Sequence, residues 1–248
     1  MIFAAISDRG LVREKNEDCF NAIVGNPNVP VTFIIADGMG GHNSGEVASK
    51  MAVDIVSELI MQRAEDFLCE EKVRQAIVEA MNGANKAIYL YSLKQKSNAG
   101  MGTTLIVTIF LNDKIYIGHV GDSRVYLIRD GNIMRVTVDH SYIEELVRMG
   151  TLSRKEAEKH PGKNVITRAL GCGEDLQIDT YCYEVMENDY YVLCTDGLTN
   201  MLSENEIKKI VENSDNPQHA CDQLVKKANE YGGEDNITVI VVKTGRVK

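Results

Sequence analysis

The chain has 248 residues, of which 44% are hydrophobic and 25% are charged, and its formal net charge at pH 7 is −9. This length fits one large domain or two small ones, and the composition is typical of a soluble globular protein. The negative charge argues against a general binder of nucleic acids or of anionic membranes.

Cysteine usage and hydropathy predict a cytoplasmic protein without a membrane span. The six cysteines include no Cys-x-x-Cys pair, and several lie inside apolar runs, so we expect reduced and buried thiols. The N-terminal stretch MIFAAISDRG has only a short apolar run with no basic residue before it, which is not the pattern of a signal peptide. No apolar run approaches the roughly 20 residues that cross a bilayer.

The first part of the chain predicts three short strands and then two helices. The strands are expected at 2–7, 19–24 and 31–36. The glycine-rich loop that begins at Asp37 leads into a helix, whose Asn43 and Glu46 have the spacing of a capping box. Apolar residues at helical spacing mark the body of this helix and of a second one at about 70–93.

The middle of the chain predicts a meander of antiparallel strands. Between residues 102 and 138, apolar strands alternate with turns as short as Asn112-Asp113, which favour hairpins. Two short helices should follow, the first capped by Ser141 and Glu144. The last elements are strands at 176–184, 190–195 and 236–243 and helices at about 203–213 and 217–231.

These elements indicate the α+β class. Pairs of helices lie between blocks of antiparallel strands, without the strict strand–helix alternation of a parallel sheet. We therefore predict a four-layer α-β-β-α sandwich, in which two antiparallel sheets pack face to face with helix pairs outside. No linker, repeat or low-complexity tract divides the chain, so we predict a single domain over residues 1–248.

Four aspartates each lie beside an apolar strand-like run, where that run meets a turn; they are Asp37, Asp122, Asp196 and Asp235. Each alone is explained as turn chemistry, because Asp-Gly and Asp-Asn are common turn dipeptides. If the strand ends meet, the carboxylates form an all-oxygen pocket of the kind that hard divalent cations require. Without a cation they would raise one another's pKa. The pattern therefore predicts a site for more than one metal ion.

Asp37 is the expected central ligand, because a carboxylate with two oxygens can bridge two cations about 4 Å apart. The backbone carbonyl of Gly38 is free to add a ligand, and Asp196 and Asp235 would complete the coordination of one ion. A water between two such ions has a lowered pKa and is a nucleophile at neutral pH.

Three residues on the loop before the second strand complete the expected site. Glu17 and Asp18 would hold coordinated waters or orient the ligands. Arg13 offers a planar fork that suits two phosphate oxygens. Its alternative is an ordinary solvated arginine on the protein surface.

Seven motifs follow one another along the chain: RGLVREKNED, ADGMGGHNSGEVAS, MGTTL, GHVGDSR, a stretch from DHS to ITRALG, TDGL and EDNITVIVV. In sequence and order they resemble the metal-dependent Ser/Thr protein phosphatases of type 2C, the PPM family, and ADGMGGH is similar to the compact bacterial members. The resemblance implies a β-sandwich flanked by helices, with two Mn²⁺ or Mg²⁺ ions in a cleft at one sandwich edge. It also implies hydrolysis of phosphoserine and phosphothreonine by a bridging water that the metals activate.

The same resemblance implies roles for single residues. Arg13 resembles the phosphate-binding arginine and Asp37 the bridging ligand. Gly38, Asp196 and Asp235 match the remaining core ligands. The implied partners are phosphorylated Ser/Thr proteins, namely substrates of a bacterial Ser/Thr kinase and the kinase itself, and nothing demands more than a monomer.

A third metal ion is also implied. Asp122, in VGDSR, resembles a ligand of that ion in bacterial members, and Asp196 would share it. Asn236 follows Asp235 as in the family's Asp-Asn pair and is expected to orient it. Residues 141–170 match the variable flap beside the cleft.

One departure leaves the proton donor for the leaving group unassigned. Members of the eukaryotic type carry a histidine directly after the Asp-Gly pair, proposed as the general acid, but Met39 stands there. His42 is expected at the helix start and does not inherit the role, so a metal-bound water is the remaining candidate.

Three other functions fit the sequence less well. A dinucleotide site would need a third glycine where Asn43 stands, and a second strand with an acidic residue after the helix. A catalytically inactive regulatory module would not need every ligand, and hydrolysis of p-nitrophenyl phosphate with Mn²⁺ separates it from an enzyme. A Ca²⁺-binding protein of the EF-hand type would use a contiguous twelve-residue loop rather than dispersed ligands.

Overall fold

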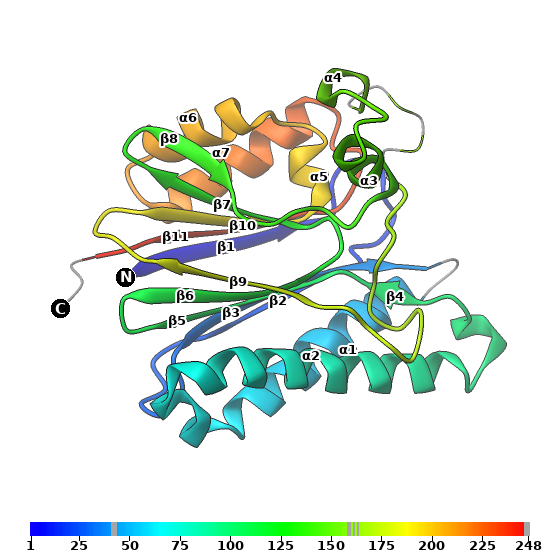
Figure 1. Cartoon of the computed structure of the whole chain (residues 1–248). Coiled ribbons are helices and arrows are strands. Elements are labelled where there is room, and N and C mark those ends of the chain that lie inside the picture. The colour runs from blue at the N-terminus through cyan, green and yellow to red at the C-terminus, as the bar shows by residue number, and fades with distance from the viewer. Residues whose placement is uncertain (41–43, 158–159, 161, 163, 246–248) are drawn as a thin grey trace.

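The computed structural model describes residues 1–40, 44–157, 160, 162 and 164–245. Two antiparallel sheets pack face to face, and a pair of helices covers the outer surface of each (Figure 1). The predicted α+β class and four-layer sandwich are therefore confirmed. Within the described residues, no helix is long and apolar enough to cross a membrane.

The sheet that lies uppermost in Figure 1 has the strand order β1-β11-β10-β7-β8. Helices α6 and α7 cover its outer face, and α7 packs on β1 and β11. The bounds of these elements are β1 (Ile2–Asp8), β7 (Arg124–Arg129), β8 (Asn132–Arg135), β10 (Tyr190–Cys194), β11 (Ile237–Lys243), α6 (Glu204–Glu212) and α7 (Pro217–Glu230).

The second sheet has the strand order β2-β3-β5-β6-β9, and the short strand β4 pairs with β3. Helices α1 and α2 cover its outer face (Figure 1), and two short 3-10 helices, η1 and η2, flank α2. The bounds are β2 (Asp18–Ile23), β3 (Val31–Met39), β4 (Gly102–Thr103), β5 (Leu105–Leu111), β6 (Lys114–Val120), β9 (Asp179–Glu184), α1 (Gly45–Met61), η1 (Ala64–Leu68), α2 (Glu70–Ser92) and η2 (Lys96–Asn98).

Capping residues determine where α6 and α7 begin. Ser203 and Glu206 form a capping box at α6, in which each side chain accepts a hydrogen bond from the other residue's backbone amide. At α7, the Asn216 side chain accepts from the backbone amide of His219, and Pro217 occupies the first turn. Both helices lie within one residue of their predicted bounds.

Strand β3 carries the candidate site to the edge of the sandwich. Its side chains alternate between two cores: Phe33 and Ile35 pack between the sheets, whereas Ile34 and Ala36 pack against the helices α1 and α2. The same alternation turns Asp37 toward the space between the two sheets. The apolar run therefore fixes which way this carboxylate faces.

Strand β3 is also longer than predicted. The prediction ended it at residue 36, but the strand continues through Asp37 and Gly38, and its last two residues pair with β4. Glycine is required here, because a Cβ on Gly38 would lie 2.2 Å from the carbonyl oxygen of Gly45 at the start of α1. The glycine-rich stretch thus begins as strand, closely covered by a helix, and Asp37 lies within the strand.

The structure adds detail at the start of α1 and directly after β10. Helix α1 has Ser44 as its N-cap residue, and the predicted cap Asn43 lies outside the described residues. A four-residue helix, α5 (Asp196–Thr199), follows β10 and was not predicted. A single helical turn is too short to carry a periodic apolar pattern.

The six cysteines are all free, as expected for reduced thiols. Cys194 and Cys221 are buried, but the prediction of general burial is wrong, because Cys69 and Cys172 are exposed. Burial raises the pKa of the Cys194 and Cys221 thiols to about 12, so neither is a nucleophile at neutral pH.

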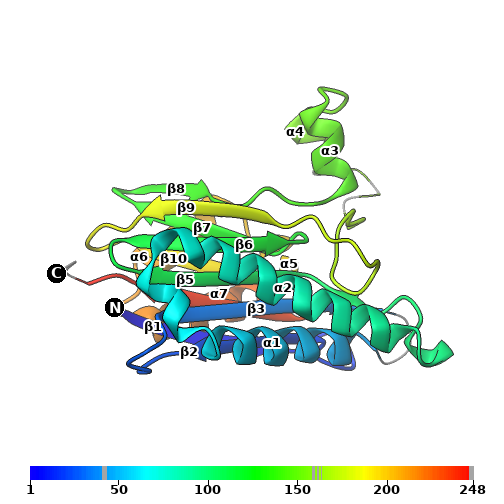
Figure 2. The same ribbon diagram turned by 60° about the horizontal axis from the view of Figure 1, so that its bottom comes forward.

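Two short helices lie apart from the sandwich on the segment that connects β8 to β9. They are α3 (Tyr142–Arg148) and α4 (Arg154–Ala157), and Figure 2 shows them standing away from the sheets. The predicted cap of α3 is confirmed, since Ser141 Oγ accepts from the backbone amide of Glu144 at 3.2 Å. A bridge between Ser141 and Ile166 closes the base of this segment.

Candidate metal centre

Five carboxylates meet at the edge of the sandwich where β3 ends. Asp18 and Asp37 face each other in the register of β2 and β3, and the carboxyl groups of Asp37 and Asp196 lie close enough to interact directly. Asp122, in the β6–β7 turn, and Asp235, just before β11, act electrostatically on Asp37. The structure therefore brings the four predicted aspartates together and adds Asp18 to them.

Four of these carboxylates, those of Asp18, Asp37, Asp122 and Asp196, have raised pKa values. Removal from bulk water raises the pKa of Asp37 well above its ordinary value, and the charges of the other four aspartates raise it further. The pKa values of Asp18, Asp122 and Asp196 are also raised, first by desolvation and then by neighbouring carboxylates. All five side chains nevertheless remain partly exposed. Positive charge arriving from solvent can reach them and would offset the repulsion.

The donor set fits a hard divalent cation of the Mg²⁺ or Mn²⁺ type. It consists of carboxylate oxygens, with backbone carbonyls close by. In the part of the chain that the structure describes, no group of three or more acidic, histidine or cysteine side chains is arranged as a ready cage that could hold a metal ion. Mg²⁺ does not need such a cage, because it is commonly held by one or two carboxylates, with waters and substrate phosphate completing its shell.

The main chain of Asp37 is held on both sides by two threonines of the MGTTL motif. Its amide donates to Thr104 Oγ1 at 3.0 Å. Its carbonyl oxygen accepts from the Thr104 amide at 2.9 Å and from Thr103 Oγ1 at 2.8 Å. The carboxylate therefore projects from a backbone that cannot shift without breaking buried hydrogen bonds.

Asp18 is held through one oxygen only. Its Oδ2 accepts from Thr195 Oγ1 at 2.9 Å and from Thr238 Oγ1 at 2.7 Å. Both threonines belong to the opposite sheet or its loops, so Asp18 links the two sheets. Its Oδ1 is buried and has no hydrogen-bond partner among the described residues. A buried carboxylate oxygen in this state has capacity for a further donor, such as a coordinated water.

Arg13 lies on the β1–β2 loop and contacts the carboxylate cluster through Asp235. Its Nη2 donates to Asp235 Oδ2 at 2.7 Å, while its side chain is 52% exposed. The side chain of Asn236 fixes this loop by binding three of its main-chain groups, among them the Glu17 amide at 2.8 Å. Asn236 reaches Asp235 with its backbone amide, which donates to Oδ1 at 2.8 Å.

Glu17 faces the start of helix α1. A Cβ on Gly45 would lie 2.7 Å from the Glu17 carboxyl group, and the Glu46 carboxylate acts electrostatically on Glu17. Desolvation and the charge of Glu46 raise the pKa of Glu17, whereas Arg13 acts in the opposite direction. Glu17 is thus adjacent to Asp18 in sequence but is directed to a different neighbour.

The turn that carries Asp122 is bonded to the base of the α3–α4 segment. The His140 amide donates to the Gly121 carbonyl oxygen at 2.8 Å, and the Gly121 amide donates to His140 Nδ1 at 3.1 Å. Gly121 has a φ of +110°, a conformation that L side chains rarely adopt. The position of Asp122 therefore depends on a glycine and on His140.

The model of the protein phosphatase 2C family matches residues 12–230. The chain belongs to this family. The phosphatase is 40% identical over 237 residues to the serine/threonine phosphatase stp of Listeria monocytogenes, a match that covers 96% of this chain and 93% of that one. The crystal structure of the Mycobacterium tuberculosis serine/threonine phosphatase PstP/Ppp superposes with a TM-score of 0.88 at 32% identity and covers 99% of both chains.

A further relative bears on the metal. The catalytic domain of the serine threonine protein phosphatase PstP, solved in complex with two manganese ions, superposes with a TM-score of 0.85 at 31% identity. It covers 99% of this chain and 98% of that chain. The present chain is thus a metal-dependent protein serine/threonine phosphatase, and its substrates are phosphoproteins.

A cavity of about 930 Å³ lies in this phosphatase between the α3–α4 segment and the helices α5 and α6. Asn200 lines it and donates to Asp196 Oδ2 at 3.0 Å, so the cavity adjoins the carboxylate cluster. On another wall, Arg135 of β8 donates to Glu144 of α3 at 3.1 Å. This ion pair ties the segment to the sandwich.

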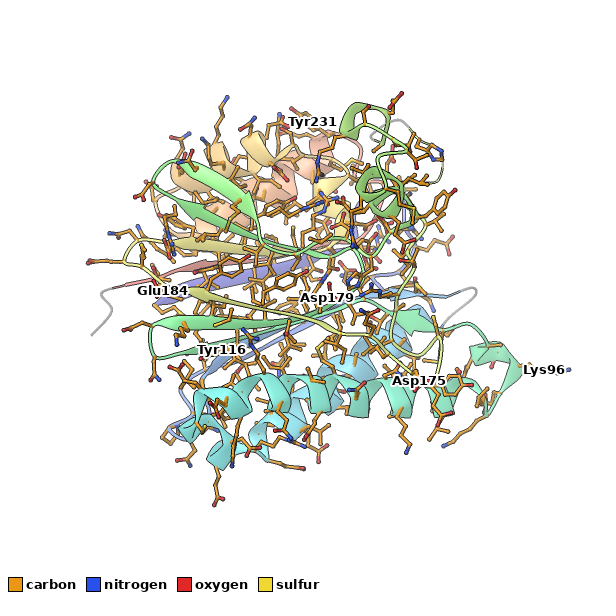
Figure 3. All side chains as sticks on the ribbon, viewed as in Figure 1. Lys96, Tyr116, Asp175, Asp179, Glu184 and Tyr231 are labelled. Carbon is orange, nitrogen blue, oxygen red and sulfur yellow. The ribbon has the colours of Figure 1, made fainter. Side chains whose placement is uncertain are left out.

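The far end of the same segment is tied down at β9. Arg168 Nη1 donates to Asp179 Oδ1 at 3.0 Å, and Asp179, labelled in Figure 3, lies at the start of that strand. His140 Nε2 is 3.3 Å from the other oxygen of Asp179. Both ends of the segment therefore meet at one place beside the Asp122 turn.

Sequence reasoning missed the four threonines that hold Asp18 and Asp37. They are Thr103, Thr104, Thr195 and Thr238. A signal was present, since each stands inside or beside a motif of the family resemblance. Met39 occupies the last position of β3, and His42 lies outside the described residues, so neither position assigns the proton donor for the leaving group.

Proposed function

We propose that this phosphatase hydrolyses phosphoserine and phosphothreonine by direct attack of a water, with Asp37 as the residue that would hold a pair of Mn²⁺ or Mg²⁺ ions. When bound, the ions supply positive charge for the phosphate and lower the pKa of the attacking water. The single observation that carries the proposal is the convergence of four carboxylates on Asp37. Metal-dependent release of phosphate from phosphoserine and phosphothreonine peptides tests it, and an equal rate without metal would contradict it.

In this proposal Asp37, Asp196 and Asp235 hold the core pair, and Gly38 adds its carbonyl oxygen. Support comes from the fixed backbone of Asp37 and from the short approach of its carboxyl group to that of Asp196. Gly38 supports it too, because any side chain there would collide with α1. The carboxylate of Asp37 thus projects from a backbone that hydrogen bonds within the chain hold in place.

Three further residues act around these ligands. We propose that Asp18 binds a coordinated water with its unpartnered Oδ1, since Oδ2 is already occupied by two threonines. Glu17 would act more indirectly, by holding the loop of Arg13 against α1. Asn236 orients Asp235 through its backbone amide and orders the same loop with its side chain.

Arg13 is proposed to bind the phosphate group of the substrate. One of its nitrogens is already engaged with Asp235, which fixes the guanidinium plane beside the carboxylates, and half of the side chain faces solvent. Arg13→Ala should therefore raise KM for phosphopeptides by about 10- to 100-fold, the equivalent of one charged hydrogen bond. The effect on kcat should be smaller, because the ground-state phosphate already carries the charge that Arg13 contacts.

Steady-state kinetics on several phosphopeptides measure this split between KM and kcat. Arg13→Lys is the matched variant, because it keeps the charge and loses the planar fork, and it should recover only part of the KM. If the KM of Arg13→Ala is unchanged, Arg13 does not bind the phosphate and is an ordinary solvated arginine on the surface.

Asp122 is proposed to hold a third, weaker ion together with Asp196. Desolvation raises the pKa of Asp122 and the charge of Asp196 raises it further, so the two carboxylates lie within electrostatic reach of each other. Asp122→Ala should leave the two core ions bound but lower the turnover of phosphopeptides. If Asp122 only caps its turn, the variant should instead lose about 0.5–2 kcal/mol of stability and keep its turnover.

Metal stoichiometry, Tm and turnover measured on the same Asp122→Ala protein separate these two outcomes. Normal turnover in the variant, together with only two bound ions in the wild type, would end the three-ion proposal.

The cellular setting follows from the same proposal. We propose that the chain acts as a single catalytic domain, and that residues 141–170 form a flap which contacts the phosphoprotein; the cavity beneath them adjoins Asp196. The proposed substrates are those of a bacterial Ser/Thr kinase and the kinase itself, and the proposed state is a monomer. Six free cysteines support a reducing compartment such as the cytoplasm.

A further inference from the structure

A buried pair of hydroxyl groups joins the strand of Asp37 to the turn of Asp122. Thr104 Oγ1 accepts the hydrogen bond of the Asp37 amide at 3.0 Å and lies 2.8 Å from Ser123 Oγ. Thr104 is only 3% exposed, and Ser123 is fully buried. One short hydrogen-bond chain therefore runs from the backbone of Asp37 to the residue after Asp122.

Thr104 also contacts both Asp37 and the Asp122 turn through its main chain and its methyl group. Its amide donates to the Asp37 carbonyl oxygen at 2.9 Å, so it binds both main-chain groups of that residue. A Cβ on Gly121 would lie 2.5 Å from the Cγ2 methyl of Thr104, so the turn rests directly on the threonine side chain. Ser123 is fixed from behind, because its carbonyl oxygen is 2.9 Å from His119 Nε2.

The hydrogen-bonding capacity of a hydroxyl group explains why the contact between Thr104 and Ser123 restricts the position of the turn. A threonine hydroxyl has one hydrogen to donate and two lone pairs, and the Asp37 amide occupies one lone pair of Thr104. A buried hydroxyl without a partner is costly, so Thr104 and Ser123 each depend on the other. A shift of the Asp122 turn away from β3 would break the bond between them. The pair thus sets the spacing between Asp37 and Asp122.

We propose that Thr104 is a positioning residue that, through Ser123, holds the Asp122 turn in register with Asp37. The hydroxyl pair then governs how tightly the carboxylates near both positions bind divalent ions. This inference rests on the proposed function of the five carboxylates. It assigns a role to a residue that touches neither substrate nor metal ligand side chains.

Three variants and one control test the inference. Thr104→Val removes the hydroxyl with little change in shape, Ser123→Ala removes only the far partner, and Thr104→Ser restores a hydroxyl. The control is Thr108→Val, on strand β5, which begins directly after Thr104. The buried hydroxyl of Thr108 donates to the Phe33 carbonyl oxygen at 3.3 Å, away from the carboxylates. All proteins are purified as the full chain and stripped of metal.

Mn²⁺ is titrated into each protein by calorimetry, and the Tm of the metal-free form is recorded. Thr104→Val should weaken Mn²⁺ binding by about 10- to 100-fold, as is usual when a residue that orients metal ligands is lost. Ser123→Ala should weaken the weakest binding event by about tenfold, and Thr104→Ser should return the titration toward that of the wild type. Thr108→Val should lower the Tm and leave the titration unchanged.

The possible results distinguish the positioning role of Thr104 from the assignment of Asp122 to a third ion. If Thr104→Val and Thr108→Val lower the Tm alike and both bind Mn²⁺ as the wild type does, Thr104 is purely structural and the inference is overturned. If Asp122→Ala keeps the weakest binding event, the third-ion assignment fails, whatever the threonine variants do. If Ser123→Ala binds Mn²⁺ as the wild type does, the proposed link from Thr104 through Ser123 is also overturned, even if Thr104→Val binds Mn²⁺ weakly.

Discussion

Asp37→Asn should lower the turnover of phosphopeptides by three orders of magnitude or more. An amide is neutral and offers one oxygen, so it cannot bridge two cations as a carboxylate does. Bound metal supplies several kcal/mol of charge stabilisation in the transition state, and each 1.36 kcal/mol corresponds to a factor of ten in rate. The hydrogen bonds of the Asp37 main chain do not involve the carboxylate and are kept.

The same substitution should not destabilise the metal-free protein. The folded-state pKa of Asp37 is raised, so its ionisation opposes folding, and this cost grows as the pH rises from the unfolded pKa through the folded one. The neutral amide of the variant does not ionise and carries no such cost. As the pH rises above the ordinary pKa of an aspartate, the Tm of metal-free wild type should therefore fall more steeply than that of Asp37→Asn.

Matched controls decide how this result is read. Asp54→Asn makes the same chemical change on the exposed face of α1, where Asp54 pairs with Lys50, and should leave turnover unchanged. Circular dichroism and Tm confirm that both variants fold. If Asp37→Asn lowers the turnover of phosphopeptides only severalfold, Asp37 is not the bridging ligand.

Removal of metal should abolish turnover entirely, and added Mn²⁺ or Mg²⁺ should restore it. Two buried cysteines and one buried histidine are poor candidates for a protein nucleophile. Cys194 and Cys221 have thiol pKa values raised to about 12, and burial lowers the pKa of His119 to about 3 while its Nε2 is engaged with a backbone carbonyl. We therefore expect water as the nucleophile, and water needs a cation to act at neutral pH.

The measurement is a single preparation assayed before EDTA, after EDTA and dialysis, and after Mn²⁺ is returned. The Tm of the stripped protein shows whether the loss of turnover comes from unfolding. Undiminished turnover in protein that elemental analysis shows to be free of metal would rule out metal-dependent hydrolysis.

Much of the fold was predictable because it depends on local patterns. Alternating apolar residues predicted most strands, short polar turns predicted the meander, and caps such as Ser141 predicted helix starts. The end of β3 was mispredicted because Asp-Gly usually marks a turn. At Gly38 the glycine instead permits close approach of the Gly45 backbone, which only the packed structure reveals.

The candidate site was predictable in part for the same reason. Aspartates at the ends of apolar runs are visible in the sequence, and the order of the motifs indicated that they converge. The position of Asp18 directly opposite Asp37 could not be predicted, because it depends on the register of β2 and β3. Its bonds to Thr195 and Thr238 join residues 177 and 220 positions apart, and the order of strands in the sheets decides such contacts.

Anomalous diffraction from crystals soaked in Mn²⁺ tests the bridging role of Asp37 most directly. The expected result is two strong peaks roughly 3.5–4 Å apart, one on each side of the Asp37 carboxylate, with Asp196 and Asp235 on one of them and a weaker third peak beside Asp122. Soaked crystals of Asp37→Asn should lose the paired peaks. A single peak, or a pair of peaks that Asp37 does not bridge, would contradict the proposed centre.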